Sequence, residues 1–273
     1  MNKAFVQLFF SNADAGKTEM LIALLSNISY SGFEETGNGL KAFISQEDFN
    51  QDALDEITNA VGVKCERSLI KEQNWNAVWE SSFDPIILGD FAAIRAGFHQ
   101  PVQNVKHEIV ITPKMSFGTG HHATTYMMIE QMKEMDLTRR SVVDFGTGTA
   151  VLAILAEKMG ATSVDAIDND EWSIENAKEN LAANNCRAVN ISRAGTLHKE
   201  KAYDIILANI NLNVIVDNLP AIIQASKKDT ELLLSGFLKQ DEADLLQLTA
   251  VFNLSHINTL QKGEWICLKF KMN

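Results

Sequence analysis

The segment from Val142 to Val151, VVDFGTGTAV, constrains the fold of this chain more than any other. A short apolar run typical of a buried strand leads into Gly146 and Gly148, and a helical pattern follows over residues 151–159. Glycines in such a turn let the backbone bend tightly and let a ligand approach without a Cβ in the way. The helix begins with free N–H groups that suit a polar ligand end. The segment therefore predicts the ligand-binding unit of an α/β fold.

An acidic residue follows this turn at a spacing typical of adenosine-binding proteins. Asp168 ends a predicted strand over residues 163–167 and stands roughly twenty residues after Gly146. A carboxylate there can accept hydrogen bonds from both hydroxyls of an adenosine ribose. Because the turn and the acid occur together, they predict an adenosine-containing cofactor more strongly than either does alone.

The residues around the turn distinguish between two classes of adenosine cofactor. A dinucleotide fold needs a small residue at the third position of GxGxxG, where this chain has Val151. The pattern present is DxGxGxA, with Asp144 two residues before Gly146. An acid so placed suits a ligand that has an ammonium group and no phosphates, such as S-adenosylmethionine. We predict that cofactor; a nicotinamide oxidoreductase and a purely structural glycine turn are the alternatives.

Two further polar segments fall where such a cofactor is expected. The segment MSFGTGHHATT, from Met115 to Thr125, is predicted to close over the methionine end. Asn209 ends a buried strand, and side chains at the carboxyl ends of parallel strands face the ligand crevice. His121 and His122 are adjacent in the sequence, and adjacent histidines rarely chelate one ion, so no metal site is predicted.

The periodicity of apolar residues divides the chain into two domains. Residues 1–70 follow the order β-α-β-β-α-β of a small ferredoxin-like α+β domain, and residues 71–83 form a connector with Trp75 and Trp79. Residues 84–273 alternate buried strands with helices, which indicates an α/β fold with a parallel sheet covered on both faces. The predicted elements are strands 5–10, 33–35, 40–44, 64–70, 142–145, 163–167, 205–208 and 232–234, helices 13–26, 47–60, 151–159 and 172–184, and a closing hairpin within 250–270.

The overall composition limits the partners and the compartment. The net charge of −11 disfavours a protein whose main role is to grip DNA or RNA, and it favours a basic partner such as a lysine-rich protein. No apolar run is long enough to span a membrane, and the N-terminus lacks the apolar core of a signal peptide. Three widely spaced cysteines fit a reducing compartment. We expect a cytoplasmic protein that does not bind DNA or membranes, with a monomer as the default state.

Four segments of this chain strongly resemble the PrmA family of bacterial methyltransferases that act on ribosomal protein L11. They are FGTGHHATT at residues 117–125, DFGTG at 144–148, ANI at 208–210 and LSGFL at 234–238. The resemblance implies a Rossmann-like class I methyltransferase domain with a mostly parallel seven-stranded sheet, S-adenosylmethionine as methyl donor, and amino groups of L11 as acceptors. It also implies that the N-terminal domain recognises the substrate.

The resemblance and the motifs together define the expected site. Asn209 is the predicted catalytic residue, because it can orient the lone pair of a neutral acceptor amine. The chain departs from the family pattern at three positions, with His121 for Thr, Ala123 for Pro and Ala150 for Gly. A related methyltransferase acting on RNA or on a small amine, and a non-catalytic cofactor-binding protein, are the alternatives. The predicted cofactor-binding residues are Phe117, Gly118, Thr125, Asp144, Gly146, Gly148, Asp168 and Asn209.

Overall fold

The fold is described from a computed structural model that covers residues 4–11, 14–30, 32–36, 38–71, 83–114, 120–197 and 200–273. Contacts along the chain divide it into two compact units, residues 1–82 and residues 83–273. Most of the predicted connector, with Trp75 and Trp79, lies outside the described residues, as do Phe117 and Gly118. Among the described helices, none combines the length and the apolarity that a membrane crossing requires.

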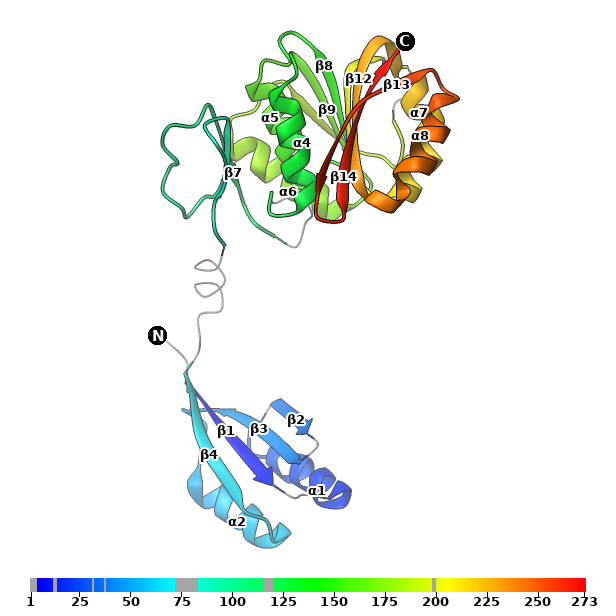
Figure 1. Cartoon of the computed structure of the whole chain (residues 1–273). Coiled ribbons are helices and arrows are strands. Elements are labelled where there is room, and N and C mark those ends of the chain that lie inside the picture. The colour runs from blue at the N-terminus through cyan, green and yellow to red at the C-terminus, as the bar shows by residue number, and fades with distance from the viewer. Residues whose placement is uncertain are drawn as a thin grey trace. The chain divides into compact units, whose positions relative to one another are not determined.

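The first unit is a four-stranded antiparallel sheet with two helices (Figure 1). Its strands lie in the order β2-β3-β1-β4. Alternate residues of β1, among them Leu8 and Phe10, pack with Leu21 and Leu25 of α1 in a core of their own. The elements are β1 (Ala4–Ser11), α1 (Ala15–Ser26), β2 (Gly32–Thr36), β3 (Gly39–Ser45), α2 (Gln51–Val61) and β4 (Cys65–Lys71).

Helix α2 begins later than the predicted start at residue 47. The Oγ of Ser45 donates to the carboxylate of Asp48 at 2.7 Å, and this contact closes a turn over residues 46–48. Asn50 then caps the helix, since its side-chain oxygen accepts hydrogen bonds from the backbone N–H groups of Asp52 and Ala53. Asx and Ser side chains compete locally with helical hydrogen bonding, which explains the shift.

The second unit contains a seven-stranded sheet in the order β10-β9-β8-β11-β12-β14-β13. The first five strands are mutually parallel, β14 is antiparallel to β12, and β13 is antiparallel to β14. The predicted mostly parallel sheet and its closing hairpin are therefore confirmed. The strands are β8 (Ser141–Phe145), β9 (Ser163–Asp168), β10 (Val189–Arg193), β11 (Tyr203–Asn209), β12 (Ser226–Leu238), β13 (Leu254–Lys262) and β14 (Trp265–Met272).

Helices cover both faces of this sheet (Figure 1). Val142 and Leu207 point into the core beneath three helices, whereas their neighbours Val143 and Ile206 point into the core on the opposite face. This alternation explains why the strands are apolar throughout. One face holds α4 (Ala123–Lys133), α5 (Val151–Lys158) and α6 (Glu171–Ala183); the other holds α7 (Leu212–Gln224) and α8 (Glu242–Ala250), which follows the short 3-10 helix η1 (Lys239–Asp241).

A small sheet precedes α4, and the sequence did not predict it. It contains β5 (Ile86–Leu88), β6 (Ala92–Ala96) and β7 (His107–Ile111), in the order β5-β6-β7. Strand β6 reads AAIRA, and alanine has a low strand propensity, so its sequence gives a weak strand signal. Strand β10 was not predicted either; it is short, and Val189 and Ile191 are its apolar residues.

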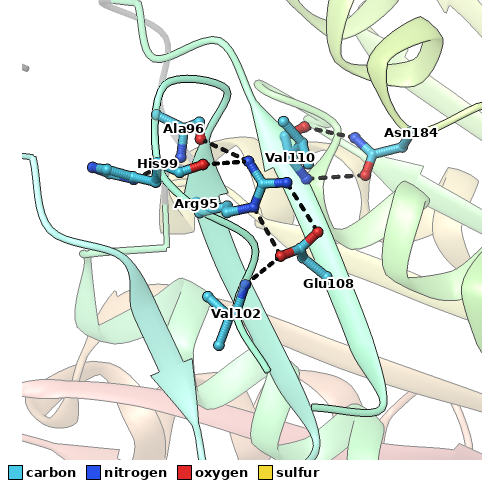
Figure 2. Close-up of polar contacts among 7 residues, drawn as sticks. All are labelled: Arg95, Ala96, His99, Val102, Glu108, Val110 and Asn184. Atoms are coloured by element: carbon cyan, nitrogen blue, oxygen red, sulfur yellow. Dashed lines mark hydrogen bonds and ion pairs between the residues drawn. The ribbon is translucent and has the colours of Figure 1, made fainter. Parts of the chain in front are cut away.

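An ion pair holds the two longer strands of the small sheet together (Figure 2). The Arg95 guanidinium donates to both carboxylate oxygens of Glu108, at 2.8 and 3.1 Å, and also to the carbonyl oxygens of Ala96 and His99. The same carboxylate accepts a hydrogen bond from Val102 N at 2.7 Å. The contact with Arg95 holds the pKa of Glu108 below its usual range. The ion pair thus fixes the loop between β6 and β7 as well as the strands.

Candidate cofactor and active site

A cavity of about 440 Å³ opens at the carboxyl ends of the central strands. Strand β8 lies between β9 and β11, so the chain order reverses at this point of the sheet. Open α/β sheets bind ligands at such a switch point. The cavity is lined by residues that end or follow β8, β9 and β11, among them Gly146, Asp168 and Asn209. The fold therefore brings together the three sequence segments that were predicted to form one site.

The turn over residues 146–150, called the glycine turn below, forms the floor of the cavity. Gly146 and Gly148 both have positive φ angles, 79° and 52°, which glycine adopts without steric cost. A Cβ on Gly146 would lie 2.0 Å from Cγ2 of Ile210. Glycine at this position therefore lets the loop after β11 approach the loop after β8. The backbone N–H groups of Gly146 and Thr147 both donate to Ile167 O, which holds the turn against β9.

Asp144 lies beneath this turn and not among the residues that line the cavity. One carboxylate oxygen accepts hydrogen bonds from the Thr147 hydroxyl at 2.6 Å and from Ala153 N at 3.2 Å. The other oxygen is buried and has no partner among the described residues. Burial raises the pKa of Asp144 to about 7, and Asp168 nearby adds to this effect. In this position, Asp144 holds the turn together from below.

Asp168 lies on the wall of the cavity at the end of β9, where it was predicted. One of its oxygens accepts a hydrogen bond from Gly148 N at 2.9 Å, and the other accepts one from Asp170 N at 3.0 Å. These contacts fix the carboxylate next to the glycine turn. A carboxylate oxygen has more than one acceptor site, so both oxygens can still accept hydroxyl groups from the cavity.

Asn209 lines the cavity and contacts Thr125, which lines a small hollow that shares Gly146 and Asn209 with the cavity. The Asn209 amide group donates to the Thr125 hydroxyl at 3.2 Å, and this contact joins the end of β11 to α4. The side-chain oxygen of Asn209 is buried and has no partner among the described residues. A buried polar atom without a partner is costly unless a ligand or water satisfies it. This acceptor is therefore available for a donor group bound in the cavity.

Trp265, which was not predicted to belong to this site, forms a wall of the cavity together with His122 of the predicted closing segment. His122 caps α4 and lies edge-on against the Trp265 ring, with 4.6 Å between the ring centroids. The neighbouring Lys262 lies over the Tyr126 ring at 3.3 Å, so the turn between β13 and β14 is attached to α4. An isolated tryptophan at the start of the last strand gives no sequence signal for a site.

Two of the three positions at which the chain departs from the family pattern, His121 and Ala150, have defined surroundings in the structure. His121 lies near Phe83, with 4.6 Å between ring centroids, and its Nε2 lies 3.1 Å from Asp84 O. Ala150 adopts a left-handed conformation with φ 64°, and its side chain is fully buried. Within the part of the chain that the structure describes, no group of three or more His, Cys, Asp and Glu residues is arranged to hold a metal ion.

Comparison with known proteins gives the family. The profile described as ribosomal protein L11 methyltransferase (PrmA) matches residues 18–273. The chain belongs to the PrmA family. It is 35% identical to the ribosomal protein L11 methyltransferase of Phocaeicola vulgatus, over 98% of this chain and 99% of the relative. It is 38% identical to that of Chlorobaculum tepidum, over 93% of this chain and 92% of the relative.

Solved structures agree with this assignment. The ribosomal protein L11 methylase of Lactobacillus delbrueckii subsp. bulgaricus superposes with a TM-score of 0.65 at 27% identity, over 70% of this chain and 100% of that one. A methyltransferase from Pyrococcus furiosus, at 19% identity and a TM-score of 0.50, shares the fold. The prediction of a Rossmann-like class I methyltransferase is confirmed: this member of the PrmA family is an S-adenosylmethionine-dependent protein methyltransferase.

The described residues fit this cofactor. Within the described part of the chain, the cavity lining contains neither lysine nor arginine, in keeping with a ligand that has no phosphates. Asp168 offers acceptors for ribose hydroxyls, and Asn209 offers a buried acceptor without a partner. Gly146 and Gly148 line the cavity and present backbone to it without a Cβ. Together these features fit S-adenosylmethionine.

Proposed function

We propose that this enzyme methylates amino groups of ribosomal protein L11, on lysine side chains and on the N-terminal amine. The support is that relatives named for this activity align with the chain over nearly its whole length. Both units of the chain are thus matched together. The net charge of −11 favours a basic protein over RNA as the acceptor.

The cofactor would be held by residues from several strand ends. We assign Asp168 to the ribose hydroxyls, Gly146 and Gly148 to the close approach of the turn, and Thr125 with Asn209 to the methionine end. Asp144 would act indirectly, by supporting the turn from beneath. Phe117 and Gly118, outside the described residues, stay predicted cofactor contacts. When bound, S-adenosylmethionine supplies a methyl group made electrophilic by its sulfonium.

The acceptor amine would lie against Asn209. A free lysine has a pKa near ~10.4, so its ammonium group must lose a proton before the lone pair can attack. The apolar part of the cavity wall, including Ile210, Val214 and Trp265, disfavours the charged form by desolvation. The buried Asn209 oxygen can then accept an N–H of the neutral amine and direct its lone pair. In-line transfer depends mainly on this alignment.

The first unit would recognise L11. Its element order and its strand order β2-β3-β1-β4 are those of a ferredoxin-like domain, which supports residues 1–70 as a separate recognition domain. Residues 71–83 would connect it to the methyltransferase domain at 84–273. We further propose a cytoplasmic monomer that binds neither DNA nor membranes.

The test is methyl transfer from labelled S-adenosylmethionine to purified L11, read as intact mass. Mass gains in steps of one methyl group are expected with the wild type. Asp168→Ala should abolish them by weakening cofactor binding, and Asn209→Ala should lower kcat while the fold is retained. Cofactor binding without any mass gain on L11, but with gain on RNA or on a small amine, would overturn the proposed acceptor.

A further inference from the structure

Three asparagines spaced four residues apart form a row on one side of α6. Asn176 and Asn180 lie within the helix, and Asn184 is its C-cap. All three are directed at the backbone of β7 and the residue that follows it. Four residues of helix rise about 6.0 Å and two residues of strand rise about 6.6 Å, so the two spacings match. The row can therefore pair with alternate residues of the strand.

The row takes the place of a missing neighbour strand. Strand β7 is an edge strand, since β6 pairs with its other side. Asn184 accepts a hydrogen bond from Val110 N at 3.0 Å and donates to Val110 O at 2.6 Å (Figure 2). Thr112 N donates to the Asn180 oxygen at 2.7 Å, and Asn176 donates to Thr112 O at 3.0 Å. Backbone groups that an edge strand would leave open are thereby satisfied.

Asn180 also reaches the cofactor site, which the other two asparagines do not contact. Its amide group donates to Thr149 O at 2.9 Å, and Thr149 belongs to the glycine turn of that site. Thr149 also borders a small hollow together with Thr125 and Asn209. Asn180 is completely buried, and its hydrogen bond to Thr149 O is buried as well. One side chain thus joins the turn to the residue after β7.

We propose that Asn180 is a positioning residue for the cofactor site, and that it acts by fixing the carbonyl of Thr149. Gly146, Gly148 and Ala150 all have positive φ angles, so the turn keeps an unusual backbone shape that its surroundings must maintain. An N–H donor on Thr149 O restrains the turn in the shape that lines the cavity. The proposal concerns cofactor affinity, so it holds whichever acceptor the enzyme methylates.

The test compares asparagines of the same row in the full-length chain. Binding of S-adenosylhomocysteine is measured by calorimetry for Asn180→Ala and for Asn184→Ala, and unfolding of both variants is followed by denaturant. Both substitutions remove a contact to β7 or to the residue that follows it, but only the first removes the Asn180 donor from Thr149 O. We expect affinity to fall roughly tenfold for Asn180→Ala and less than about twofold for Asn184→Ala. Equal losses of affinity in the two variants would show that the row of asparagines has only a structural role, and would overturn the proposal.

A second variant separates the two hydrogen bonds of Asn180. Asn180→Asp keeps an acceptor for Thr112 N and loses the donor to Thr149 O while the new carboxyl is ionised. When protonated, this carboxyl can donate again. Relative to Asn180→Ala at the same pH, its affinity for S-adenosylhomocysteine should therefore recover as the pH is lowered. An affinity ratio that does not change with pH, or wild-type affinity in both variants, would contradict the role of Thr149 O.

Discussion

At the scale of single residues, conformation and burial determine what the glycine turn tolerates. Ala150 stands at φ 64°, in the region that favours glycine, yet its methyl group is fully buried in the core on the α5 side of the sheet. A left-handed conformation costs a non-glycine residue about 1–2 kcal/mol. Burial of the methyl and the lower entropy of the unfolded chain offset much of this cost. The departure from the family's glycine is thus explained by packing.

Ala150→Gly should therefore change the free energy of unfolding by less than about 1 kcal/mol, because the relief of strain and the lost burial nearly cancel. Ala150→Val should cost at least about 2 kcal/mol, since a β-branched side chain is strongly disfavoured at positive φ. Denaturant unfolding of both variants checks this. Equal effects of glycine and valine would show that the backbone at residue 150 does not require a left-handed conformation.

The raised pKa of Asp144 makes the free energy of unfolding depend on pH and sets the sign of that dependence. Burial raises the pKa to about 7, whereas an unfolded aspartate titrates near ~3.9. The folded state therefore holds the proton longer, and stability falls as the pH rises toward 7. Other groups of the wild type titrate over the same range, so the measurement is the difference in stability between the Asp144→Asn variant and the wild type.

Between pH 5 and pH 8, the stability of Asp144→Asn relative to wild type should rise by about 2.5 kcal/mol. The asparagine side chain can still accept from the Thr147 hydroxyl and has no charge to bury. Urea unfolding at several pH values provides the curves. If the two curves run parallel over this range, Asp144 does not titrate as its burial implies.

At the scale of elements, the small sheet depends on one ion pair more than on strand propensity. Arg95 has a side chain only 11% exposed, and Glu108 is 27% exposed. Removing one partner of such a pair leaves a charge that is poorly solvated. The strands of the large sheet are buried on both faces in continuous cores. An ion pair of similar burial, between Lys269 and Glu231, also joins β14 to β12 there.

Glu108→Gln should lower the free energy of unfolding by about 1–3 kcal/mol, because Arg95 loses its ionised partner. The matched control is Glu175→Gln, which breaks the exposed pair with Lys178 and should cost less than about 0.5 kcal/mol. Thermal unfolding of the two variants is compared. Similar costs for both would mean that the partly buried pair contributes no more than a surface pair.

At the scale of the whole molecule, the two units have separate hydrophobic cores. The contacts along the chain also divide between residues 82 and 83. Separate cores support independent folding of the catalytic unit. Cofactor binding and substrate recognition should then be separable.

A fragment of residues 83–273 should bind S-adenosylhomocysteine about as tightly as the full chain. Its kcat/KM for L11 should fall on the order of a hundredfold, if the first unit supplies docking contacts of about 3 kcal/mol. Calorimetry and the mass assay measure the two quantities. Full activity of the fragment on L11 would remove the first unit from substrate recognition.

The sequence by itself determined the features that depend on residues close to one another in the chain. The turn at Gly146, the acid at Asp168 and the alternation of strands with helices are short-range patterns, because a turn, a strand end and a buried face each impose their own residue types. The position at a strand end indicated Asn209, and family resemblance added Thr125. The structure brings the two side chains within 3.2 Å of each other.

Only the tertiary structure decided the features that depend on contacts between distant residues. It placed Asp144 beneath the turn, joined Trp265 to His122, and linked Asn180 to Thr149. It also revealed the small sheet and β10, whose own sequences have weak strand signals. The physical reason is that burial, ion pairing and hydrogen-bond partners are set by packing across the fold, which no local pattern of residues encodes.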